Sequence, residues 1–160
     1  MTPIKNCIVN KDTTRNPIWL MRQAGRYLPE FREIRKKNQD FIKLCLNSNL
    51  ASEITLQPIK RFGFDGAVIF SDILMLPYGL GQKVEFKKDF GPKLGEIDLE
   101  NIERLDEINF TKKVHKVYEA ISKTSIDPIM NNKDMIGFVG APWTIPVSYT
   151  HLTLPTTPYV

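Results

Sequence analysis

Two arginines separated by three residues form the segment of the chain best suited to chemistry. Arg22 and Arg26 flank the small spacer Gln23-Ala24-Gly25 and are followed directly by an aromatic residue. A guanidinium carries a permanent charge and a planar set of donors, which bind a carboxylate or phosphate at two points. Two such groups on a short turn that contains glycine can hold a ligand with several anionic groups. Paired arginines are also common in surface salt bridges, and the spacing alone leaves both interpretations open.

A carboxylate follows an apolar run near the middle of the chain. Residues 67–70 (Ala-Val-Ile-Phe) are preceded by Phe64-Asp65-Gly66 and followed by Ser71 and Asp72. A continuous apolar run after a glycine turn predicts a strand that is buried on both faces, as in a parallel sheet. Asp72 would then lie near the carboxyl end of that strand, where α/β proteins gather ligands and catalytic groups. Asp72 can instead cap the turn that follows, and this alternative stays open.

The elements that must position these residues alternate between helix and strand. Asn47-Ser48-Asn49 can cap a following helix, and Pro58 is expected to kink or break that helix because it removes a backbone donor. Hydrophobic spacing and glycine or proline punctuation delimit the remaining elements. We predict helices at residues 29–37, 41–46, 50–62 and 112–123, strands at 67–71 and 135–139, an irregular lead-in at 1–16, and a long loop at 77–95 in which 84–86 form a hairpin arm.

Composition indicates an ordinary globular protein and excludes few classes by itself. The chain has 160 residues, of which 42% are hydrophobic and 25% charged, and its net charge of +4 is spread among acids and bases. The two cysteines, Cys7 and Cys45, form neither a disulfide framework nor a metal-ligand pattern with the histidines. We therefore expect reduced thiols in a cytoplasmic protein without a metal. No secretion signal is visible, and no apolar run approaches the roughly 18 residues of a membrane span.

Five segments of the chain resemble, in order and spacing, motifs of the uroporphyrinogen decarboxylase family. The resemblance covers about residues 15–145. The segments are PIWLMRQAGRYLPEF at 17–31, EITLQP at 53–58, IFSDIL at 69–74, GP at 91–92 and GFVGAPWT at 137–144.

This resemblance implies an α/β fold, the amino-terminal portion of a (β/α)8 TIM barrel. A complete barrel needs about 250 residues, so we expect the chain to be truncated, with residues 1–145 belonging to the barrel. Residues 146–160 depart from the family pattern, because three prolines in 13 residues cannot form the expected helix. We interpret 146–160 as a non-native tail and give His151 within it no functional weight. Alone, the truncated chain is expected to show no decarboxylase activity and little cooperative unfolding.

The resemblance also implies a reaction and the residues that carry it. The reaction is the cofactor-free decarboxylation of the four acetate side chains of uroporphyrinogen III to give coproporphyrinogen III. Asp72 would accept the pyrrole N–H groups and stabilise a cationic pyrrole, while Arg22 and Arg26 would orient the substrate carboxylates and assist the reacting acetate. The backbone N–H groups of Gln23-Ala24-Gly25 would bind carboxylate oxygens. Arg35 is a weaker candidate, for which a solvated helix face is the alternative. A cytoplasmic homodimer is implied for the full-length protein.

Three other interpretations compete with this one. A corrinoid-linked methyltransferase of the same superfamily would use zinc ligands from later in the sequence, but the complete Arg-Gln-Ala-Gly-Arg motif favours the decarboxylase. A nucleic-acid-binding module is supported only by a pI of about 9.0, without a continuous basic face or a recognised motif. The third is a non-functional truncation product.

Overall fold

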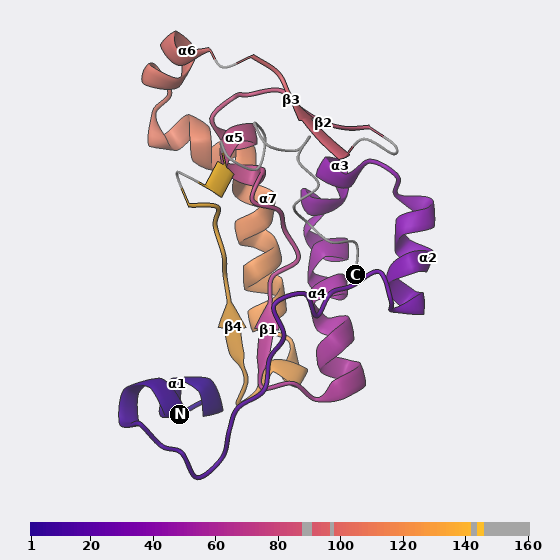
Figure 1. Cartoon of the computed structure of the whole chain (residues 1–160), viewed down its shortest axis with the longest axis vertical. Coiled ribbons are helices and arrows are strands. Elements are labelled where there is room, and N and C mark those ends of the chain that lie inside the picture. Colours follow the sequence, from indigo (N-terminus) through magenta and orange to yellow (C-terminus); the bar gives the residue numbers. More distant parts are fainter. Residues whose placement is uncertain (88–90, 97, 142–143, 146–160) are drawn as a thin grey trace. The chain divides into compact units, whose positions relative to one another are not determined.

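The structure is a computed structural model that describes residues 1–87, 91–96, 98–141 and 144–145 (Figure 1). The chain divides into two compact units. The first comprises residues 1–71 and 114–138, and the second comprises 72–113 and 139–160. The tail interpreted as non-native (146–160), with His151, lies outside the described residues, as do positions 142 and 143 of the last motif.

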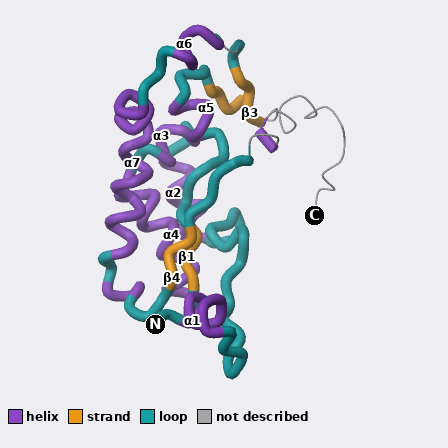
Figure 2. The backbone as a smooth tube through the Cα atoms, turned by 90° about the vertical axis from the view of Figure 1, so that its left-hand side faces the viewer, coloured by secondary structure: helices purple, strands orange, loops and turns teal. Residues whose placement is uncertain are grey.

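The first unit is built on a parallel pair of strands, β1 (Gly66–Val68) and β4 (Asp134–Ile136). Gly66 pairs with Asp134 and Val68 with Ile136, and the Ile69 N–H continues the pairing by donating to the Ile136 carbonyl. Helix α7 (Glu107–Ser125) and the 3-10 turn η1 (Pro128–Met130) lead into β4. Figure 2 shows the two strands lying side by side. The described residues therefore form a mixed α/β fold, as predicted.

Three of the helices that precede β1 were predicted. They are α2 (Pro29–Lys37), α3 (Phe41–Cys45) and α4 (Ser48–Phe62). Asn47 caps α4 as expected, because its side chain accepts the Leu50 N–H. The chain does not break at Pro58, since α4 continues to Phe62 as the predicted bounds 50–62 indicate; a kink at Pro58 stays a prediction. Residues 54–59, which include Pro58, are all buried, and this packing outweighs the roughly 3 kcal/mol that an internal proline costs.

The apolar run that leads to Asp72 is buried, as its pattern predicted. All four residues of 67–70 are at least nine-tenths buried, although the regular strand β1 is shorter than the predicted 67–71. The Phe70 ring makes edge contacts with Phe31 of α2 and Phe41 of α3, with both centroid distances at 5.8 Å. Such aromatic pairs stabilise a core beyond their buried area. The carboxyl end of the run is therefore fastened to two helices.

Two predictions for the first unit are wrong. Residues 1–16 are not all irregular, because Pro3–Asn10 form helix α1. β4 is only half-buried rather than buried, and Phe138 and Val139 after it are 44% and 71% exposed. Among the described residues, β4 hydrogen-bonds to no strand other than β1, so apolar residues beyond it have little to pack against.

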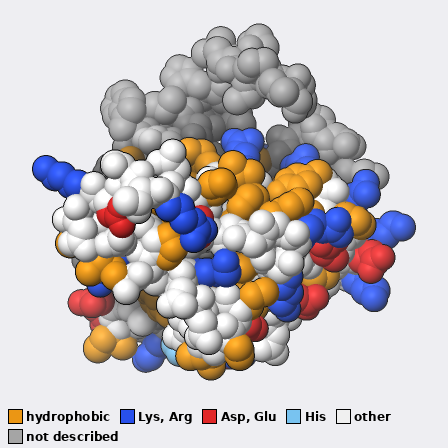
Figure 3. Space-filling view, turned by 90° about the horizontal axis from the view of Figure 1, so that it is seen from below, with side chains coloured by type: hydrophobic (Ala, Val, Ile, Leu, Met, Phe, Trp, Pro, Cys, Tyr) orange, Lys and Arg blue, Asp and Glu red, His pale blue; other side chains and the backbone are white. Residues whose placement is uncertain are grey.

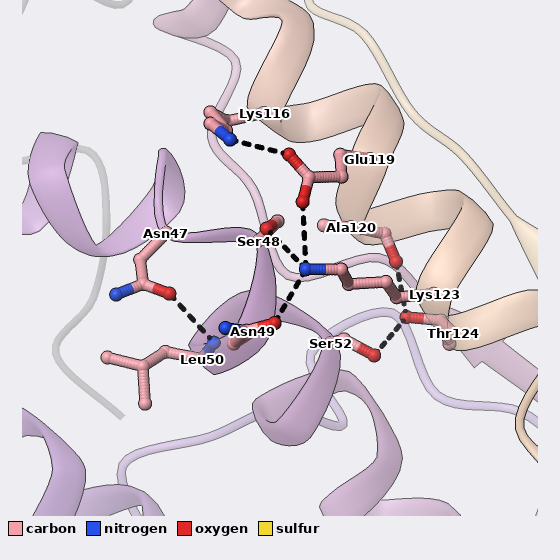
Figure 4. A network of polar contacts seen from close by, with 10 residues as sticks. All are labelled: Asn47, Ser48, Asn49, Leu50, Ser52, Lys116, Glu119, Ala120, Lys123 and Thr124. Carbon is pink, nitrogen blue, oxygen red and sulfur yellow. Dashed lines mark hydrogen bonds and ion pairs between the residues drawn. The ribbon is translucent and has the colours of Figure 1, made fainter.

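Helices α4 and α7 are joined by a polar network at their facing surfaces (Figure 4). Lys123 donates to Ser48 Oγ and Asn49 Oδ1 at the start of α4, and pairs with Glu119 at 2.8 Å. Beneath this pair, the buried Thr124 hydroxyl is hydrogen-bonded to Ser52 Oγ at 3.0 Å. The network accounts for the two residues by which α7 runs past the predicted end at Lys123, since its last turn is anchored to α4. At its other end α7 begins at Glu107, five residues before the predicted start.

The contribution of Glu119 to this network should make the free energy of unfolding depend on pH. Hydrogen bonds from Lys116, Lys123 and Ser48 lower the pKa of Glu119 to about 2. A depressed carboxyl pKa stabilises the fold above the unfolded value near 4.5, and this stabilisation is lost as pH falls toward 2. In the full-length protein, urea titrations followed by circular dichroism should therefore show Glu119→Gln less stable than wild type at pH 7, with the difference vanishing near pH 2. Glu53→Gln, at an exposed position of α4, is the control; an equal loss there would contradict the prediction.

The second unit contains elements that the predicted long loop at 77–95 did not anticipate. Helix α5 (Met75–Gly79) comes first, and β2 (Val84–Lys87) then pairs antiparallel with β3 (Gly91–Leu94). The hairpin arm predicted at 84–86 is thereby confirmed. Pro77 is tolerated because it lies in the first turn of α5, where a backbone donor has no helical partner. A further short helix, α6 (Leu99–Glu103), was not predicted.

Candidate functional site

Asp72 is a half-buried carboxylate that caps a turn in the second unit. Its Oδ1 accepts the Leu74 N–H at 2.9 Å, and its carbonyl accepts the Met75 N–H at 3.1 Å. The capping alternative is therefore confirmed. Oδ2 has no hydrogen-bond partner within the part of the chain that the structure describes. Burial raises the pKa of Asp72, and the hydrogen bond from Leu74 only partly opposes this shift. Asp72 thus retains an oxygen that can accept a ligand's N–H group.

The backbone two residues before Asp72 is held by a side chain that the sequence analysis did not single out. Thr55 on α4 is fully buried, and its Oγ1 accepts the Phe70 N–H at 2.9 Å while donating to the Ala51 carbonyl at 2.6 Å. One hydroxyl therefore links the helix to the end of the apolar run. The only sequence signal for it was its place in the EITLQP segment.

Removing this hydroxyl should be costly. In Thr55→Val the Phe70 N–H would be left buried without an acceptor, and such an unsatisfied donor costs about 1–3 kcal/mol. In the full-length protein we expect urea unfolding to show a loss of that size, together with faster hydrogen exchange at the Phe70 amide. Thr55→Ser, which keeps the oxygen, should retain slow exchange. Equal exchange rates in the valine and serine variants would contradict the assignment.

Arg22 and Arg26 lie on an exposed loop of the first unit, between residues 20 and 28. Neither guanidinium has an ion-pair or hydrogen-bond partner among the residues described. Arg15 and Arg61, by contrast, pair with Asp65 and Glu30. The surface salt-bridge interpretation is therefore wrong for Arg22 and Arg26 in this structure. Two cations close together in sequence are left available to an anionic ligand.

The loop is fastened to β1 by the side chain of Gln23, which is 1% exposed. Its Nε2 donates to the Gly66 carbonyl at 2.9 Å, and its Oε1 accepts the Leu20 N–H at 3.0 Å. The Gln23 N–H is also engaged, because it donates to the Leu20 carbonyl at 3.2 Å. Of the three backbone donors predicted to bind substrate, only those of Ala24 and Gly25 lack an acceptor in the described parts of the chain.

Arg35 and Gly25 have contacts other than those expected. The Arg35 guanidinium donates to the carbonyls of Asn38 and Gln39 at the end of α2, and it lies 5.3 Å from the Phe41 ring centre. A substrate role for Arg35 stays a prediction. The Tyr27 ring fills the space beside Gly25. In this structure the missing side chain of the glycine therefore makes room for Tyr27.

The geometry of the site therefore has two separate parts. The first unit presents the arginine loop, and the second presents the capping carboxylate of Asp72. That both parts face one cavity stays a prediction. The described residues contain no cluster of three or more potential metal ligands, and none of their helices is long and apolar enough to cross a membrane. On the face seen in Figure 3, basic and acidic side chains are interspersed.

Comparisons with known proteins agree with the motifs. Residues 1–151 match the family model "Uroporphyrinogen decarboxylase (URO-D)". Proteins named uroporphyrinogen decarboxylase from Rickettsia felis and Agrobacterium fabrum are 45% identical over 137 residues and 48% identical over 135 residues. These matches cover 86% and 84% of this chain but 39% of each relative, so the chain spans about two-fifths of their length. A Chelativorans relative of the same name is 49% identical over 129 residues, which are 81% of this chain and 37% of that relative. Matched along nearly its whole length, the chain belongs to the uroporphyrinogen decarboxylase family.

Proposed function

We propose that this chain supplies the arginine loop and the central carboxylate of a uroporphyrinogen decarboxylase. The full-length protein would convert the four acetate side chains of uroporphyrinogen III to methyl groups, giving coproporphyrinogen III without a cofactor. The observation that carries the proposal is a pair of guanidinium groups, Arg22 and Arg26, that have no partner among the described residues and lie on a loop tied to β1. A substrate with eight carboxylates needs such fixed cations.

The chemistry requires a place for the electron pair that the departing CO2 leaves behind. Protonation of the ring carbon next to the one that bears the acetate creates a cationic ring, whose charge on the acetate-bearing carbon accepts this pair when the carbon–carboxylate bond breaks. The resulting exocyclic methylene then gains a proton as the ring carbon loses one, so that each step replaces CO2 by one proton. A catalyst must therefore favour the cationic pyrrole, and preorganised charge is an effective means of doing so.

Asp72 suits this role in the proposed mechanism. A carboxylate only accepts hydrogen bonds, which matches the converging N–H donors of the macrocycle. The cap on the Leu74 N–H holds one oxygen in place and leaves Oδ2 for those donors. Arg22 and Arg26 would bind peripheral carboxylates, with the Ala24 and Gly25 N–H groups assisting them.

The strand arrangement supports a barrel as the complete fold. β1 and β4 are adjacent and parallel, with α7 preceding β4 in the chain. Residues 18–23 lie beside β1, since the Asp65 N–H donates to the Ile18 carbonyl and the Gln23 side chain donates to Gly66. The three segments are residues 18–23, β1 and β4, and helices separate each from the next along the chain. Such an alternation is typical of a singly wound (β/α)8 barrel. The barrel, its homodimeric assembly and a cytoplasmic location belong to the same proposal.

A full-length version of the protein would test the proposal directly. We would continue the chain, from the end of the matched region, with the remaining three-fifths or so of the Agrobacterium fabrum relative. This protein should convert uroporphyrinogen to coproporphyrinogen in buffer without added metal or cofactor, as measured by chromatography of the oxidised products. A soluble, folded protein that leaves uroporphyrinogen unchanged would overturn the proposed function.

A further inference from the structure

One hydrogen bond within the arginine loop (residues 20–28) has no role in the proposed mechanism. The Tyr27 hydroxyl donates to the Gln23 carbonyl at 2.6 Å, although the residue is 52% exposed. We propose that Tyr27 is a positioning residue, whose hydroxyl closes the loop and so orients Arg26, and through the loop Arg22, toward substrate carboxylates. This inference rests on the proposed function and deepens it.

The hydroxyl connects the part of the loop that is anchored with the part that is not. Gln23 is buried and bonded to β1 through its side chain. Residues 24–26 have no side-chain anchor of their own in the described structure. The Tyr27–Gln23 bond encloses exactly these three residues, and the Leu28 N–H closes the far side by donating to the Gly25 carbonyl at 3.1 Å. The Tyr27 hydroxyl therefore adds a second link across the backbone that carries Arg26, beside the bond from Leu28 to Gly25.

Gly25 is the residue that allows the tyrosine to reach this position. A β-carbon built on Gly25 would lie 2.2 Å from Tyr27 Cε1 and 2.5 Å from Cδ1, far inside van der Waals contact. The ring therefore lies directly against the glycine α-carbon. Gly25 and Tyr27 therefore act together: the glycine leaves the space that the ring needs for its hydroxyl to reach the Gln23 carbonyl.

Positioning of this kind should change substrate binding more than it changes the chemical step. A loop that is already ordered loses less conformational freedom when its arginines bind carboxylates. Carboxylates distant from the reacting acetate are held alike in the ground state and the transition state, and weakening such uniform binding raises KM without changing kcat. A residue needed only for folding would instead reduce the amount of active protein.

Tyr27→Phe in the full-length version tests the inference with the loss of a single oxygen. From the value of a typical hydrogen bond we expect KM for uroporphyrinogen to rise about threefold to tenfold. The value of kcat should stay within about twofold, and the thermal midpoint should not move. Tyr118→Phe, which alters an exposed tyrosine of α7, is the matched control and should leave both constants unchanged. An unchanged KM in Tyr27→Phe would overturn the inference.

A double-mutant cycle distinguishes action through Arg26 from a general effect on the fold. In an Arg26→Ala background, Tyr27→Phe should raise KM by less than about twofold, because the group that it positions is gone. A full effect in that background would overturn the inference. Gly25→Ala, which displaces the ring, should raise KM in the same direction as Tyr27→Phe, and an unchanged KM would also contradict it. If the unsubstituted full-length version has no activity, the proposed function fails, and this inference fails with it.

Discussion

Asp72→Asn in the full-length version is expected to lower kcat by about a hundredfold to a thousandfold, the range found when a preorganised electrostatic group is removed from an active site. The amide oxygen can still accept the Leu74 N–H, so the turn that Asp72 caps should be preserved. What the substitution removes is the negative charge that stabilises the cationic pyrrole. Steady-state rates of coproporphyrinogen formation measure the effect.

Asp106→Asn provides a control of the same chemical kind in the same unit. Asp106 is an exposed residue whose side chain also caps a turn, by accepting the Asn109 N–H at 2.7 Å. Its substitution should leave kcat unchanged. If Asp72→Asn retained full activity, or if both variants lost activity equally, Asp72 would have no place at the centre of the mechanism.

Arg22→Ala and Arg26→Ala should each weaken substrate binding strongly. A hydrogen bond to a charged group is worth about 1.5–3 kcal/mol, which corresponds to a rise in KM of about tenfold to a hundredfold. Because neither guanidinium has a partner in the described structure, stability should change little. Initial-rate kinetics at several substrate concentrations, together with thermal unfolding, would separate the two effects.

The lysine variants and Arg32 sharpen this prediction. Arg22→Lys and Arg26→Lys keep the charge but lose the planar pair of donors, so they should recover only part of the binding. Arg32→Ala removes an equally exposed, partnerless arginine of α2 and should leave KM near its original value. A KM that rises equally in Arg22→Ala, Arg26→Ala and Arg32→Ala would indicate a general charge effect rather than a carboxylate-binding loop.

The elements that could be predicted from sequence are those with local signals. Pro29 at the first position of α2, the Asn47 cap of α4 and the apolar run before Asp72 all lie within or beside the elements they specify. The end of α4 at Phe62 was predicted as well, but a local rule expected Pro58 to disturb the helix, whereas its unbroken course depends on burial by other parts of the chain. The half-buried state of β4 likewise depends on which neighbours it has.

The same distinction applies to the candidate site. Two cationic side chains in one short loop could be predicted from the spacing of Arg22 and Arg26. The role of the Gln23 side chain could not, because its acceptor on Gly66 is 43 positions away. The Thr55 hydroxyl and the Phe70 amide are likewise 15 positions apart. Single polar contacts between distant segments leave no periodic trace in a sequence.

The cap of α1 has a consequence for the order of events during synthesis. Thr2 makes no side-chain cap of its own helix; instead the carboxylate of Asp134 accepts the Ile4 N–H at 3.1 Å and the Thr2 hydroxyl at 2.5 Å. These partners are 130 and 132 positions apart. An eight-residue helix is marginal without tertiary support. During synthesis, residues 1–10 must therefore wait for Asp134, which is made later, before helix α1 is held in place. At about 5–20 residues per second, that interval is on the order of ten seconds, during which residues 1–10 are open to proteases and chaperones.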